Sequence, residues 1–305
     1  GWLYSQGLRV GKPGWHNGLT LAQWRWQPDD CAPLAGTDLV LSDLFPVTVH
    51  MGTVTVAACD SGADDDDAVL PASLPWTPPF LLSIDAMQAP EIGGVVPPPL
   101  QVTARQQQQH WSLTVESTAS HLKADYERGD GQWSVSGNGA LNEWLADGKG
   151  RWQLDGEGVW QGQPAGTLSA TLEDVGLQSQ PQKADLAMKA RFTGAQWQAE
   201  MRLTEPLAVH GQWQLAIPEP LSLQGQGIAL WQAGGQLQLQ GPPGQIHVFA
   251  GSDEDSVEQG AGRVVLEGPE LDGQVDFQWQ DRRLILAPAC LTLPEQVSAR
   301  WEQPL

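Results

Sequence analysis

The chain has 305 residues and a formal net charge of −20 at pH 7, with only 16 Lys and Arg residues. Nucleic-acid phosphates and anionic lipid surfaces are bound by clustered Lys and Arg, so this composition argues against nucleic acid as a partner and against flat docking on a membrane. The sequence has no apolar run long enough for a transmembrane helix and no basic segment followed by the apolar block of a secretory signal.

The first 79 residues predict a β-rich end piece tied by a disulfide. Strands are expected at 19–26, where the apolar phase changes midway and indicates a bulge, at 39–41 and at 47–56. Cys31 and Cys59 flank the last two strands, and a bridge between them would close a loop of about 28 residues and stabilise the fold by roughly 3 kcal/mol. A disulfide would indicate an oxidising compartment; the alternative is a pair of buried, reduced thiols.

Residues 61–79 form the clearest break in the pattern. Four consecutive aspartates at 64–67 precede four prolines, a composition that predicts an exposed loop. Calcium binding is an alternative role for the aspartates, although they lack the spaced Asp, Gly and Glu ligands of a calcium loop. We therefore expect two parts, the end piece at 1–79 and a long sheet at 80–305.

From residue 80 onward, short segments alternate apolar and polar residues at roughly 8 to 14 residues per strand and turn, as serial hairpins do. The clearest segments are 184–192 and 197–203. A second acidic loop is expected at 251–262, and the best helical candidate, 140–146, is under two turns long. The pattern predicts an all-β fold: a long antiparallel meander that forms an elongated, twisted and curled sheet with one apolar face.

That apolar face is the candidate functional site, because it would form the floor of a groove if the sheet curls without being sealed. The alternative is a purely structural β-repeat scaffold whose apolar face is sealed by a second layer. Cys290, without a partner, is expected to be a small buried hydrophobe. The candidate groove residues are Leu186, Met188, Phe192, Trp197, Met201, Leu203, Val209, Trp213 and Leu215.

The sequence gives no constellation of catalytic or metal-binding residues. Its six histidines are scattered without zinc-site spacing, and no glycine-rich loop opens a helix to hold phosphate. We expect no enzyme activity, no cofactor and no metal. A secreted carbohydrate-active enzyme is the other alternative, with tryptophans as sugar platforms and Glu143, beside Trp144, as the candidate carboxylate.

Several short motifs follow one another in the first ninety residues: Gly7-Leu8, Asp30-Cys31-Ala32-Pro33-Leu34-Ala35, Val49-His50-Met51-Gly52-Thr53-Val54-Thr55-Val56, Cys59, Leu74-Pro75 and Ile84-Asp85. In this order they resemble the N-terminal region of the AsmA-like family of bacterial intermembrane lipid-transport proteins. The resemblance implies a noncatalytic periplasmic bridge, anchored in the inner membrane, whose curled sheet holds phospholipid tails in a continuous groove. It also implies an N-terminal transmembrane helix and a far C-terminal end, both outside this chain, the latter meeting the outer-membrane lipoprotein YnbE by strand addition.

Overall fold

The computed structural model describes residues 8–11, 13–15, 18–26, 34–56, 79–91, 96–145, 148–177, 183–208, 212–226, 229–253, 256–280, 283–293 and 297–301. Over these residues the chain forms 24 strands, joined in one sheet, and a single 3₁₀ turn. It divides into two compact units, unit 1 (Gly1–Gly166) and unit 2 (Thr167–Leu305). The all-β class is confirmed, and the boundary expected after residue 79 stays a prediction.

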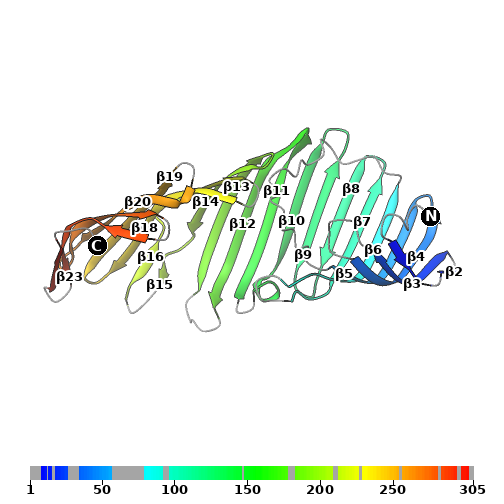
Figure 1. The fold of residues 1–305 in the computed structure, drawn as a ribbon, viewed down its shortest axis with the longest axis horizontal. Coiled ribbons are helices and arrows are strands. Elements are labelled where there is room, and N and C mark those ends of the chain that lie inside the picture. The colour runs from blue at the N-terminus through cyan, green and yellow to red at the C-terminus, as the bar shows by residue number, and fades with distance from the viewer. Residues whose placement is uncertain are drawn as a thin grey trace. The chain divides into compact units, whose positions relative to one another are not determined.

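Strands of unit 1 follow one another in chain order, and β6 to β11 lie side by side from cyan to green in Figure 1. At the other end of the unit, β1 and β2 both pair with β3, which pairs with β4. The elements are β1 (Leu8–Val10), β2 (Pro13–Trp15), β3 (Leu19–Trp26), β4 (Leu34–Leu44), β5 (Val47–Val56), β6 (Phe80–Gln88), β7 (Leu100–Gln107), β8 (His110–Glu116), β9 (His121–Glu127), β10 (Gln132–Ala140), η1 (Leu141–Glu143), β11 (Gly148–Gln161) and the start of β12 (Gln163–Leu177).

One pairing in unit 1 departs from an antiparallel meander. β5 and β6 run parallel, with Met51 opposite Ile84, and the Val47 N–H donates a hydrogen bond to the Pro79 carbonyl at 2.8 Å. Parallel neighbours need a long connection instead of a tight hairpin. The sheet is therefore mixed, and the connection is the segment that contains the predicted acidic and proline-rich loop.

The bulge expected in β3 does not appear as a shift of register, because Leu21 pairs with Leu39 and Gln23 with Thr37 in one continuous register. Asp38 of β4, opposite the middle of β3, has a left-handed φ of 54°. Leu21 and Trp24 are both 8% exposed although they are three residues apart. A regular strand would turn them to opposite faces, so the irregularity places both on the buried side.

Unit 2 is also built mainly from hairpins. β14 pairs with β13 and β17, and β18 pairs along one edge with both β16 and β17. Its elements after β12 are β13 (Ala184–Thr193), β14 (Gln196–Leu203), β15 (Leu207–Ala208), β16 (Gln214–Ala216), β17 (Leu221–Gln226), β18 (Ala229–Gly241), β19 (Gly244–Asp253), β20 (Ser256–Glu267), β21 (Asp272–Gln280), β22 (Arg283–Leu286), β23 (Ala289–Leu293) and β24 (Val297–Trp301).

Two expectations for unit 2 are wrong. The acidic loop expected at 251–262 is mostly strand, because the β19–β20 ladder continues to Asp253 opposite Ser256, where backbone pairing outweighs the local composition. Cys290 is exposed, not buried. It lies in β23 between Ala289 and Leu291, which are less exposed, so the alternation of the strand turns the thiol outward.

Few side chains of the described residues are buried completely. The buried apolar residues are Leu21, Trp24, Val54, Leu100, Val102, Tyr126, Leu141, Ala199, Leu266, Leu271 and Val275. Most other apolar strand residues are of intermediate exposure. Nowhere in the described ranges is there a helix with the length and apolar character needed to cross a membrane.

Candidate functional site

The predicted groove residues of β13 and β14 lie directly opposite one another. Leu186 faces Leu203, Met188 faces Met201 and Phe192 faces Trp197. Directly opposite residues of an antiparallel pair point to the same side of the sheet. These six residues therefore share one face, called the unit-2 apolar face below.

The unit-2 apolar face continues across the neighbouring strands. From β14 to β21 the register aligns apolar residues of successive strands on this side. They are Ala199, Leu223, Ala233 and, four residues further along β18, Leu237, then Val248, Val264 and Val275. Leu215 of β16 joins it through Leu207 and Leu239. Trp213 precedes β16, and Val209 lies outside the described residues, as do Cys31 and Cys59 with their expected disulfide.

The opposite side of the same strands is polar. Lys189 lies opposite Glu200, and Arg191 opposite Gln198. All four side chains are exposed. The two sides of β13 and β14 therefore differ sharply in chemistry, and a shift of one residue in register would exchange them.

Side chains on the unit-2 apolar face are half-covered. Met188 is 38% exposed, and Met201, Leu203, Trp197 and Leu215 are of intermediate exposure. Ala199, at 5%, is among the few that are buried. Apolar residues between two packed layers are usually fully buried, so this face is apolar without being closed throughout.

Unit 1 has a comparable apolar face. One row across β6 to β10 runs through Leu82, Ala104, Leu113, Ala124 and Val135, each directly opposite the next. Leu113 stands between two alanines and is 37% exposed. Small neighbours leave its side chain accessible at the middle of the strand.

One margin of the unit-1 apolar face is packed by aromatic rings. Phe80 and Trp111 meet edge to face with ring centroids 5.3 Å apart. Gln106 lies opposite both residues in the register and is 2% exposed, with its amide donating to the Gln108 carbonyl at 2.8 Å. The packed rings and the buried Gln106 close this margin. Because the Gln106 Oε1 has no partner among the described residues, its burial destabilises the fold somewhat.

At the turn that joins β8 to β9, Glu143 of η1 forms hydrogen bonds with the turn residues. Its carboxylate accepts hydrogen bonds from the hydroxyls of Ser117 and Ser120 and from the Ala119 N–H at 2.9 Å. Partial burial raises the pKa of Glu143, but these three hydrogen bonds outweigh burial and bring the pKa below its usual value. A carboxylate held in its ionised form is suited to a structural role and not to that of a general acid. Sequence reasoning missed this contact, because the serines lie more than twenty residues away.

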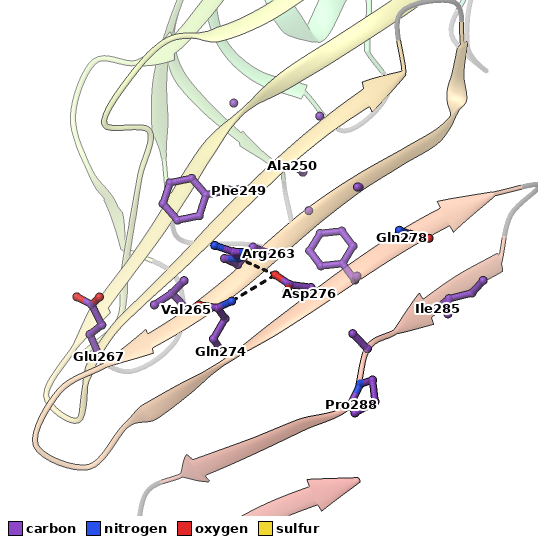
Figure 2. A pocket seen from close by; sticks show the side chains of 16 residues that line it. Phe249, Ala250, Arg263, Val265, Glu267, Gln274, Asp276, Gln278, Ile285 and Pro288 are labelled. Carbon is purple, nitrogen blue, oxygen red and sulfur yellow. Dashed lines mark hydrogen bonds and ion pairs between the residues drawn. The ribbon is translucent and has the colours of Figure 1, made fainter. Parts of the chain in front are cut away.

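A hollow of about 1020 Å³ lies on the polar side of β19 to β21 in unit 2 (Figure 2). Arg263 donates to the Asp276 carboxylate at 2.6 Å, and Gln274 lies within 3.5 Å of the same oxygen. Exposed ion pairs of this kind add little stability. The hollow is open to solvent, and most of its lining, including the apolar Phe249, Val265 and Ile285, is on the side opposite to the predicted groove residues. No cluster of three potential metal ligands occurs among the described side chains.

Residues 1–296 match the family model described as YdbH-like, intermembrane phospholipid transport protein YdbH. No curated protein and no solved structure gives a significant match to the chain.

Proposed function

Because the chain belongs to the YdbH-like family of intermembrane phospholipid transport proteins, we propose that its apolar sheet faces form a groove that shields phospholipid acyl chains as they pass between the inner and outer membranes. The family assignment covers nearly the whole chain and implies a position between two membranes. In this proposal the protein is a noncatalytic periplasmic conduit. It is anchored in the inner membrane and meets the outer-membrane lipoprotein YnbE by strand addition.

The observation that carries the proposal is the half-covered apolar face. Met188 and Leu113 keep more than a third of their surface exposed in the middle of strands, where a sealed core would hide them. Leaving apolar side chains in contact with water costs about 25 cal/mol per Å². A mobile apolar occupant would remove that cost without requiring a permanent second layer.

A phospholipid acyl chain is also more stable against an apolar surface than in water. Moving an acyl tail of about 16 carbons into water costs about 12 kcal/mol, at about 0.8 kcal/mol per methylene. An apolar floor removes most of this barrier, while the charged headgroup stays in water. The polar face then needs no role in binding.

Crosslinking from the two sides of one strand pair tests the proposal. A photoreactive amino acid at Met188 or Met201 of the full-length protein in cells should capture phospholipid. The same group at Lys189 or Glu200, one position along each strand and on the polar side, should not. Equal labelling on the two sides would contradict the assignment of the groove.

The alternatives predict different results. A sealed structural scaffold gives no phospholipid adduct at any of these positions. A carbohydrate-active enzyme would need a free carboxylate pair, whereas the Glu143 carboxylate is occupied by Ser117 and Ser120. No observation on the described residues favours either alternative over the conduit.

A further inference from the structure

Aromatic residues on the apolar faces repeatedly lie across from glycine. The pairs occur in both units, and in five of them the two residues are directly opposite in register, while Trp213 aligns with Gly241 through the Leu215–Leu239 pairing. In each pair, a Cβ atom added to the glycine would overlap the aromatic side chain. The pairs are Trp24 with Gly36, Trp133 with Gly158, Trp152 with Gly139, Trp213 with Gly241, Phe277 with Gly262 and Trp279 with Gly260.

The Trp213–Gly241 pair shows the geometry most simply. The three atoms nearest to a Cβ added at Gly241 all belong to the indole of Trp213: Cδ2 at 2.6 Å, and Cε2 and Cε3 at 2.8 Å. Nearly equal distances to three neighbouring ring atoms mean that the glycine faces the plane of the ring. The indole therefore lies flat over the backbone of β18, in space that any other residue would fill.

Two of the indoles that contact these glycines are held at a cost in stability. The Nε1–H groups of Trp24 and Trp152 are buried and have no hydrogen-bond partner among the described residues. A buried donor without a partner destabilises the fold, whereas an indole that projects away from the sheet can be solvated. The indoles of Trp133 and Trp279 instead donate to the carbonyls of Ala165 and Val257. The contact between indole and glycine therefore occurs whether or not the indole N–H has a partner.

We infer that the glycines opposite aromatic residues are positioning residues: they let the rings lie flat, and so keep the apolar floor clear for acyl chains. The inference rests on the proposed function. It means that these glycines determine how deep the groove is. A side chain at Gly241 would lift the Trp213 indole off the sheet and into the space above it. The same substitution on the polar face would leave that space unchanged.

The test measures phospholipid retained by the full-length protein after extraction from membranes, in molecules per chain. Gly241→Val should reduce retention roughly tenfold, as over-packing of a filled apolar site does. The matched control is Gly251→Val in the adjacent strand β19, on the polar face, where an added Cβ would meet no atom within 4 Å. It should retain phospholipid like the wild type.

A double variant separates positioning from stability. Trp213→Ala combined with Gly241→Val removes the ring that would be lifted, so it should restore retention even though its melting temperature falls further. Failure of the double variant to restore retention would overturn the inference, as would Gly241→Val with wild-type retention. Gly241→Ala, which adds only Cβ, gives the same comparison if valine prevents folding. Wild-type protein without any phospholipid would instead contradict the proposed function itself.

Discussion

An arginine on the apolar face should stop phospholipid movement while leaving the protein folded. Met201 is the best position, because it lies in β14 between Met188 and Leu221, at the middle of the unit-2 apolar face. A guanidinium in a hydrocarbon environment costs about 2.5 to 3.5 kcal/mol. At 1.4 kcal/mol per factor of ten, an acyl chain should pass this point roughly a hundredfold more slowly.

The cost to folding should be much smaller. A fully buried Met contributes about 1.5 to 3 kcal/mol, and the half-covered Met201 roughly half of that. An arginine can also extend its charge toward water while its methylenes stay on the apolar surface. We therefore expect Met201→Arg to lower the free energy of unfolding by about 1 kcal/mol.

The assay follows radiolabelled phospholipid from the inner to the outer membrane in cells that produce the full-length variant, with the melting temperature of the purified protein measured in parallel. Ser222→Arg is the matched control, because Ser222 is exposed on the polar side of β17 and lies opposite Glu200. It should transport at the wild-type rate. Normal transport by a folded Met201→Arg protein would refute the reasoning, and so would equal loss in both variants.

Two further predictions concern Glu143 in η1 and Cys290 in β23. Glu143→Gln should destabilise unit 1 by about 1 kcal/mol at neutral pH, because a neutral amide is a poorer acceptor for the Ser117 and Ser120 hydroxyls than a carboxylate. Since the folded-state pKa of Glu143 is lowered, its contribution is complete above the unfolded-state pKa and is lost as the pH falls through the folded-state pKa; the difference in melting temperature between the two proteins should shrink on acidification, and a constant difference would contradict this. Cys290 is exposed, so a maleimide should label it in the native protein, and a need for denaturant would show that the thiol is covered.

Alternation of apolar and polar residues was sufficient to predict the local structure of the sheet. The segments at 184–192 and 197–203 are the strands β13 and β14, and their apolar residues face one another as expected. The same rule, applied to Ala289, Leu291 and Leu293, places Cys290 on the outward side. The error at Cys290 came from treating the thiol by its residue type and not by its position in the strand.

Features that depend on contacts between distant strands could not be read from the sequence. The parallel pairing of β5 with β6 joins segments on the two sides of the predicted loop, and no periodicity within either strand encodes its direction relative to the other. The flat arrangement of Trp213 over Gly241 requires the register of β16 against β18. The Glu143 network needs the turn at 117–120 to lie beside η1. In each case the signal lies in which strands are neighbours, and one sequence does not contain it.

The most direct test of the central claim is crosslinking from the middle of unit 1, far in sequence from the predicted groove residues. Leu113 is exposed on the apolar face between Ala104 and Ala124, while Ser112, its neighbour in β8, points to the polar side opposite Arg105 and Asp125. A photoreactive group at Leu113 in cells should capture phospholipid, and the same group at Ser112 should not. Phospholipid adducts at both positions in equal yield, or at neither, would contradict the account.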